Sequence, residues 1–333
     1  MKYSKKRHLL QQLPTGEEHL IFSYHFKGSK KGPKIYLQAN LHGPEIFGTF
    51  LLGNLINYLE NKKDFPGEVI VVPCANPIAV NSVAYNSIIG RYNLQSGKNW
   101  NRNFDVDAEF KDHGEEKKYY VKQLKESSLP IEKRISAILK LISSNAGYII
   151  DIHTSGSESI VHLFTFAESN EVFLPLKAQV HINLNYDGAV GAFDESKVVP
   201  FVNSLSKSEL PHVCTWEASR HGHMNQEQIG KKTKELIRFL ESVWVKNKVK
   251  RKVLPKIFSI DNSDYLVSPA SGYYCWRKNA GTIINKGEVF AEVYQPSSNK
   301  RIELRADFKF ILIAKYGIGA IGRGEQIGWM ARY

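Results

Sequence analysis

Three short apolar segments constrain the fold of this chain more than any other feature of its sequence. Residues 34–40, 68–73 and 147–153 are largely apolar, which is typical of strands that are covered on both faces of a sheet. Between them, residues 46–60 and 131–143 carry apolar side chains at helical spacing. Strands that alternate with helices in this way favour an α/β domain with a mostly parallel mixed sheet flanked by helices.

The pattern changes after residue 256. Helical spacing disappears and short strand-like segments follow one another, separated by glycine turns, at residues 264–268, 273–277, 288–295, 300–305, 308–315 and 325–332. We therefore expect two domains, one at 1–250 that carries the chemistry and a small all-β domain at 251–333. A length of 333 residues agrees with one large and one smaller unit.

Composition argues against several classes of protein. Apolar runs are far shorter than the roughly 20 residues of a membrane-spanning helix, and no secretory apolar segment follows the basic N-terminus, so we expect a cytoplasmic protein with no membrane partner. Cys74, Cys214 and Cys275 are too widely spaced to suggest a disulfide framework.

The net charge of +12 attracts anions in general. Its clearest cluster is six Lys and Arg residues between 246 and 256, where interleaved aromatic residues are absent. This pattern favours a solvated linker over a nucleic-acid surface, and we expect no nucleic-acid partner. The sequence leaves a homo-oligomer open.

Two of the predicted strands end close to a histidine. The first is followed by His42-Gly43-Pro44-Glu45, and the second ends at His153. Ligands of open α/β sheets bind beyond the carboxyl ends of the strands. If Pro44 opens a helix, His42 and Glu45 lie on one face of it. Two histidines and a glutamate form an established catalytic zinc set, so we expect one zinc ion per chain on His42, Glu45 and His153.

Two acidic residues accompany this set. Asp151 lies on the same side of its strand as His153, where it either orients the imidazole or serves as a buried hydrogen-bond partner. Glu217 follows an apolar segment, where a carboxyl group is costly unless it is used or paired. Glu217 is therefore the candidate general base.

A polar loop at residues 75–104 supplies candidates for holding a substrate. Arg102, beside Asn101, is suited to bind a carboxylate, and Arg91 to polarise a carbonyl group. The alternative for these residues is hydrogen bonding between the loop and the sheet.

Taken in order, these motifs resemble the succinylglutamate desuccinylase/aspartoacylase family, a branch of the zinc carboxypeptidase-like (M14) hydrolases. The resemblance covers nearly the whole chain, and its matching elements lie at residues 40–45, 76–77, 90–91, 101–104, 151–154 and 216–218. It implies a zinc-carboxypeptidase-like fold with a barrel-like β sandwich at the C-terminus. It also implies hydrolysis of an amide bond, most simply deacylation of a small carboxylate-bearing N-acyl amino acid.

The resemblance also implies roles for single residues. The three expected ligands would bind zinc, and Glu217 would act as general base and later as proton donor. Arg91 would stabilise the carbonyl oxygen in the tetrahedral intermediate. Asn101 and Arg102 would grip the substrate carboxylate. The family further uses a tyrosine from outside the ligand set, for which Tyr273 and Tyr274 are candidates.

Three departures from the family pattern concern the substrate pocket and leave the metal set intact. The usual Asp-Leu-Asn-Arg is Asn-Trp-Asn-Arg at residues 99–102, the residues after Glu217 lack the glycine that many relatives have, and residues 105–130 form a long charged insertion. A carboxypeptidase acting on short peptides is the runner-up function. A non-catalytic binding protein would predict a damaged metal set or a missing base, and a nucleic-acid binder would need a recognition motif that the sequence lacks.

Overall fold

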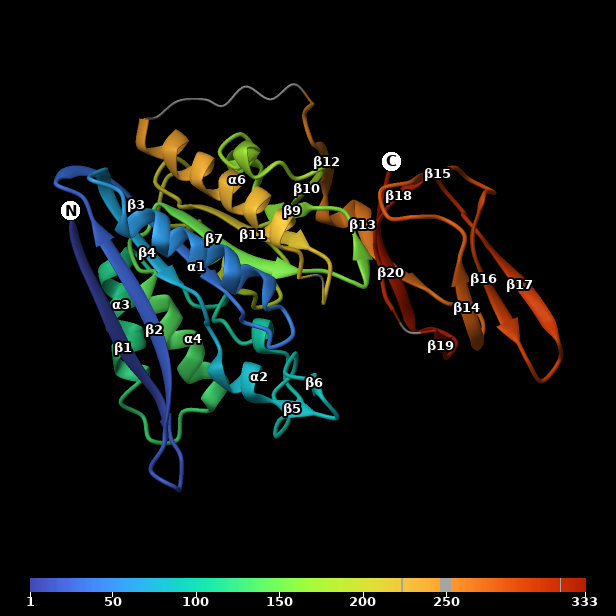
Figure 1. Cartoon of the computed structure of the whole chain (residues 1–333), viewed down its shortest axis with the longest axis horizontal. Coiled ribbons are helices and arrows are strands. Elements are labelled where there is room, and N and C mark those ends of the chain that lie inside the picture. The colour runs from blue at the N-terminus through green and yellow to red at the C-terminus, as the bar shows by residue number, and fades with distance from the viewer. Residues whose placement is uncertain (223, 246–252, 318) are drawn as a thin grey trace.

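Figure 1 shows the computed structural model of the chain, which describes residues 1–222, 224–245, 253–317 and 319–333. Five members of the basic cluster expected as a linker lie outside the described residues, namely Lys246, Lys248, Lys250, Arg251 and Lys252. Within the described ranges, none of the helices has the length and apolar character needed to cross a membrane.

A nine-stranded sheet forms the larger part of the molecule, with strand order β1-β2-β4-β3-β7-β11-β9-β10-β12. Neighbours are parallel from β4 through β3 and β7 to β11 and from β9 through β10 to β12, whereas β1/β2, β2/β4 and β9/β11 are antiparallel. The expected mostly parallel mixed sheet is confirmed. The strands are β1 Lys2–Gln12, β2 Glu18–Lys27, β3 Lys30–Ala39, β4 Pro66–Val72, β7 Tyr148–Thr154, β9 His162–Thr165, β10 Val180–Asn183, β11 His212–Ser219 and β12 Lys256–Ser259.

Helices cover both faces of this sheet (Figure 1). On one face, α1 (Phe47–Glu60) and α6 (Gln226–Val245) share an apolar core with β3, β4, β7 and β11. On the other face, α4 (Ile131–Ile142) buries Ile135, Ile138, Leu139 and Ile142, whose spacing places them along one stripe of the helix. The other helices and short strands of this part of the chain are α2 Pro77–Asn81, β5 Val83–Ala84, β6 Ser87–Ile88, η1 Trp100–Arg102, α3 His113–Gln123, η2 Ala167–Ser169, η3 Leu174–Leu176, α5 Phe193–Ser196 and η4 Val199–Phe201.

The C-terminal region forms two small antiparallel sheets around a separate apolar core. One sheet has the order β13-β20-β18-β15 and the other β17-β16-β14-β19. All six strands expected from the sequence are present, so the all-β character of this region is confirmed. The elements are η5 Ile260–Asn262, β13 Ser263–Val267, β14 Gly272–Trp276, β15 Ile283–Ile284, β16 Val289–Gln295, β17 Lys300–Arg305, β18 Phe310–Lys315, β19 Ala320–Ile321 and β20 Gln326–Arg332.

The two regions are joined by strand pairing and by a shared core. Strand β8 (Glu158–Ser159) follows β7 closely and pairs with β18 of the C-terminal region. Ile160 and Ile182 from the large domain pack with Ile311 and Ile313 of β18 in one apolar cluster. This contact fixes the end of β18 beside the carboxyl end of β7, where His153 lies.

Candidate metal centre

The carboxyl ends of β3 and β7 bring three side chains to one point. His42, Glu45 and His153 are 4%, 2% and 3% exposed, and in the described part of the chain they form a group whose ligand atoms all lie within 4.8 Å of one another. Glu45 Oε1 is 3.0 Å from His42 Nδ1, and Glu45 Oε2 is 2.7 Å from His153 Nδ1. The expected ligand set is thus assembled, with both Nδ1 atoms toward the carboxylate.

The backbone conformation that brings His42 and Glu45 together differs from the expected one. Helix α1 begins at Phe47, so Pro44 does not open a helix and that prediction is wrong. Instead the Glu45 backbone N–H donates to the His42 carbonyl (3.2 Å), which closes a turn. The turn brings the two side chains together without any helical periodicity.

Hydrogen bonds from the Asn40 side chain and from neighbouring backbone hold this turn in place. Asn40 has a left-handed φ of 61°, and its side-chain amide donates to the carbonyls of His42 (2.8 Å) and Gly43 (3.0 Å). The Gly43 N–H donates to the Gly90 carbonyl (2.9 Å), and a Cβ at Gly43 would lie 2.1 Å from the Ala79 carbonyl oxygen. Glycine is therefore required at position 43, and the ligand turn is tied to the loop that continues into Arg91.

The imidazole of His42 lies between two acceptor oxygens. Its Nε2 is 2.9 Å from Asn99 Oδ1, and that oxygen also accepts the Asn101 backbone N–H (2.9 Å), which fixes the orientation of the amide. Burial lowers the pKa of His42, against the opposing charge of Glu45, and so disfavours a second proton on the ring. With the proton on Nε2, the Nδ1 lone pair faces Glu45 Oε1, an unfavourable contact that a cation between the two atoms would relieve.

His153 lies between two carboxylates. Its Nε2 donates to Asp151 Oδ2 (2.9 Å), and its Nδ1 faces Glu45. Burial opposes charge on this ring, but Asp151 and Glu45 outweigh it and raise the His153 pKa well above its ordinary value. The centre therefore requires positive charge, supplied by a proton or by a metal ion. Two imidazoles and a carboxylate form this ligand set, and positive charge between their facing acceptor atoms would stabilise it. The set is therefore consistent with one bound metal ion.

Glu217 and Arg91 lie beside the three candidate ligands. In the parallel pair β7/β11, Glu217 is the direct partner of His153, and its Oε2 is buried without a hydrogen-bond partner among the described residues. Burial, reinforced by Glu45, raises the pKa of Glu217 to about 8, against the opposing effect of His153 and Arg91. The Arg91 Nη1 donates to Glu45 Oε1 (3.0 Å) while about half of its side chain, 46%, remains exposed.

The two residues of the expected carboxylate clamp, Asn101 and Arg102, make their side-chain hydrogen bonds away from the three candidate ligands. Asn101 is buried, and its Oδ1 accepts the Phe193 backbone N–H (2.8 Å) at the start of α5. Arg102 is exposed, and its Nη1 donates to the Asn101 carbonyl (2.6 Å). The structure thus gives Asn101 a scaffolding contact, and the substrate-binding roles of both residues remain predictions.

The structure adds three residues that the sequence did not single out for the site. Asn99 contacts His42, as described above. Tyr316, directly after β18, interacts electrostatically with Arg91 and Glu217, while burial raises its pKa. By contrast Tyr273 is exposed, and the Tyr274 hydroxyl donates to the Tyr316 carbonyl, so neither expected tyrosine lies where Tyr316 does.

His221 is the third added residue. Its Nδ1 hydrogen-bonds to the Thr154 hydroxyl (2.8 Å), and its backbone N–H donates to the Gly156 carbonyl (2.8 Å). Burial lowers the pKa of this imidazole, which also senses the charges of Glu45 and Arg91. The segment after Glu217, which departs from the family pattern, therefore contributes to the rim of the centre.

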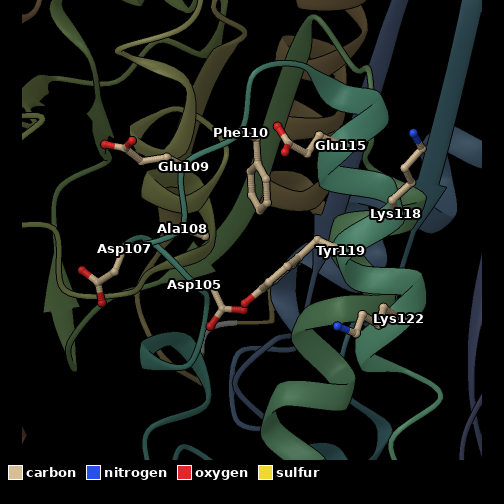
Figure 2. A pocket seen from close by; sticks show the side chains of 9 residues that line it. All are labelled: Asp105, Asp107, Ala108, Glu109, Phe110, Glu115, Lys118, Tyr119 and Lys122. Atoms are coloured by element: carbon tan, nitrogen blue, oxygen red, sulfur yellow. The ribbon is translucent and has the colours of Figure 1, made fainter.

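A separate cavity lies away from the metal centre. The cavity has a volume of about 720 Å³ and lies in the charged insertion, and Figure 2 shows the side chains that line it, from α3 and from the segment that precedes it. Asp107 and Glu109 extend from that segment, whereas Lys118 and Lys122 extend from α3 (Figure 2). No predicted site residue lines this cavity, so it is separate from the metal centre.

Comparison with known proteins places this site in a family. The model of the succinylglutamate desuccinylase/aspartoacylase catalytic domain matches residues 31–243. This segment contains the three candidate ligands together with Glu217 and Arg91. A search among curated protein sequences gives no significant match.

Solved structures share the fold along almost the whole chain. A protein from Shewanella frigidimarina assigned to the same family has a TM-score of 0.90 at 17% identity, over 99% of this chain and 97% of its own. A family protein from Shewanella amazonensis has a TM-score of 0.89 at 18% identity, over 98% of both chains. The product-bound ectoine utilization protein EutE from Ruegeria pomeroyi has a TM-score of 0.71 at 15% identity, over 100% of this chain and 95% of its own. At these identities the likeness extends to the fold alone.

Proposed function

Since the chain belongs to the succinylglutamate desuccinylase/aspartoacylase family, we propose that it is a zinc-dependent hydrolase that removes the acyl group from a small N-acyl amino acid or a related amide. One observation carries the proposal. The buried His42, Glu45 and His153 set lies beside a buried carboxyl oxygen of Glu217 that has no hydrogen-bond partner among the described residues. A metal set accompanied by a free base is the arrangement that metal-assisted hydrolysis requires.

Glu217 supplies the proton transfers of this reaction. A zinc ion on the three ligands would lower the pKa of a water molecule and polarise the amide carbonyl. Glu217 accepts a proton from the attacking water and then gives it to the departing amine. Burial raises the pKa of this carboxyl group to about 8, so it can hold the proton between the two transfers, and the charge of a metal ion bound beside it would favour the ionised form that accepts the proton.

Positive side chains select the substrate. Arg91 is half exposed at the metal centre, so its guanidinium can donate to the carbonyl oxygen as negative charge develops there. Arg102 is exposed at the end of η1 and makes no ion pair among the described residues, so it can bind a carboxylate of the substrate. A small amide that bears a carboxylate fits this distribution of charge.

A carboxypeptidase acting on short peptides remains the second candidate. Both functions use the same metal set and base. The pairing of β18 with β8 places Tyr316 within electrostatic range of Arg91 and Glu217, so the C-terminal region also contributes to the site. Binding without catalysis is disfavoured, since the ligands and the base are all present.

Metal content is the decisive first measurement. Elemental analysis of the purified native chain should give about one zinc per chain, and the His153→Ala variant should lose it. The loaded enzyme is then assayed on N-acyl amino acids and, in parallel, on short peptides with the same C-terminal residue. Turnover of the N-acyl amino acids supports the proposal, and turnover of peptides alone would establish the carboxypeptidase. A native chain that neither contains nor takes up zinc would refute both.

A further inference from the structure

Two buried polar atoms on adjacent strands lack partners among the described residues. One is Nε2 of Gln38 on β3, and the other is Oδ1 of Asp151 on β7. Both residues are fully buried, and they are direct partners in the parallel β3/β7 register. Their side chains therefore project from the same face of the sheet at the same level. An amide N–H is a donor and a carboxylate oxygen is an acceptor, so the two unpaired atoms are complementary.

The other polar atom of each side chain is already engaged. The Tyr36 hydroxyl donates to Gln38 Oε1 (2.8 Å), and His153 Nε2 donates to Asp151 Oδ2 (2.9 Å). Burial, helped by the charge of Asp151, raises the pKa of Tyr36 well above its ordinary value, so the phenol keeps its proton and remains a donor. These contacts leave one gap in an otherwise continuous hydrogen-bonded series from Tyr36 to His153.

Among the described residues, no equivalent donor is free on the other side of Asp151. Its register partner on β11 is Thr215, whose hydroxyl donates to Asp194 Oδ2 (2.8 Å) instead. Among the side chains in this row of the sheet, Gln38 alone of the described residues offers an uncommitted donor to Asp151. A buried carboxylate oxygen without a hydrogen bond is costly, which favours closing the gap.

We propose that Gln38 is a positioning residue for His153. Its amide N–H groups bind Asp151 Oδ1, directly or through one buried water molecule, and so fix the plane of that carboxylate. The fixed carboxylate holds the His153 ring with Nε2 toward Asp151 and Nδ1 toward Glu45. This inference rests on the proposed function, because it takes His153 as a metal ligand. Gln38 itself touches neither metal nor substrate.

Metal affinity tests this role without recourse to activity. In the full-length chain, Gln38→Met keeps the length of the side chain and removes its hydrogen bonds. The matched control is Thr215→Val, which also removes a polar group next to Asp151, but one that is committed to Asp194. Chelator competition should show zinc binding about tenfold weaker in Gln38→Met, as is typical when a partner behind a metal ligand is lost. Thr215→Val should bind zinc as the native chain does.

A second variant and a second readout guard against simple misfolding. Tyr36→Phe keeps the volume of the ring and removes the donor to Gln38, so it should weaken zinc binding in the same direction. Cobalt-substituted native protein and Gln38→Met should differ in their visible absorption bands, because the geometry of the His153 ligand changes. Native affinity together with a native cobalt spectrum in Gln38→Met would overturn this inference alone. A native chain that binds no metal would overturn the proposed function and this inference with it.

Discussion

Glu217 on β11 and His153 on β7 are register partners in adjacent parallel strands. A candidate general base and a candidate metal ligand are thus held side by side by the backbone of the central sheet rather than by mobile loops. Sites built on strands are more precise than sites built on loops, so the separation of base and ligand is fixed by the fold. This relationship leads to the first prediction.

Glu217→Gln should abolish turnover and leave the metal bound. The amide fills the same space as the carboxyl group but cannot accept a proton from water, so we expect kcat to fall by about a thousandfold. Zinc content, measured on the same preparation, should remain that of the native chain. His153→Ala is the control, since it should lose both metal and turnover. A Glu217→Gln enzyme that loses its zinc would contradict the assignment of this residue as base.

In the metal-free protein, the free energy of unfolding should depend on pH through the ionisation of Glu217. Burial raises the folded-state pKa of this carboxyl group from its ordinary value of 4.5 to about 8. Between these values the unfolded chain has released the proton and the folded chain has kept it. The free energy of unfolding therefore falls, through this group, as the pH rises across that window.

Glu217→Gln removes this contribution. Denaturant unfolding in the presence of a chelator should be measured at several pH values from 5 to 8. The free energy of unfolding of the variant should increase relative to that of the native chain as the pH rises. Above about pH 8 the difference should level off, because the folded chain has then lost the proton as well. Two stability curves that stay parallel across the window would mean that the folded-state pKa is not raised.

The ligand set could be predicted from the sequence because strand ends meet at one edge of a parallel sheet. The geometry between the ligands could not, since His42 and Glu45 lie on a turn that precedes α1 rather than on the first turn of that helix. Strand β1 was not foreseen either, because its residues Lys2–Gln12 are mostly polar and exposed on an outer strand. Periodicity is a strong signal only where one face of an element is buried.

Long-range contacts account for the other residues that were missed. Tyr316 reaches the centre because β18 pairs with β8, two segments that are about half the chain apart in sequence. Asn99 reaches His42 through the irregular loop before η1, whose path has no periodic signature. Such contacts depend on tertiary structure, which local sequence pattern does not encode.

Tyr316→Phe should affect catalysis and leave metal binding intact. The phenol lies within electrostatic range of Arg91 and Glu217, and its raised pKa keeps it a hydrogen-bond donor at neutral pH. Loss of a donor to the reacting substrate should lower kcat/KM by about 10- to 100-fold, as expected for one buried hydrogen bond to a charged group. Tyr273→Phe is the control, since Tyr273 is exposed and should change neither constant. Equal kinetics in the two variants would exclude Tyr316 from the site.

A buried charge cluster connects the charged insertion to the large domain, and it carries the last prediction. Glu116 on α3 contacts the ammonium groups of Lys140 on α4 (3.1 Å) and Lys197 after α5 (3.0 Å), and all three side chains are almost completely buried. Burial, together with the charge of Lys197, lowers the pKa of Lys140 to about 7 despite the opposing effect of Glu116. One carboxylate thus compensates two buried amines.

Glu116→Gln should therefore destabilise the fold by about 3–5 kcal/mol at neutral pH, because it leaves buried positive charge without a partner. Glu109→Gln is the matched control, since Glu109 is exposed in the same insertion and should change the free energy of unfolding by less than about 0.5 kcal/mol. Adding Lys140→Met to Glu116→Gln removes one unpaired amine and should recover part of the loss. Denaturant unfolding of the four proteins measures these differences. Equal stability of Glu116→Gln and Glu109→Gln would show that the cluster does not anchor the insertion.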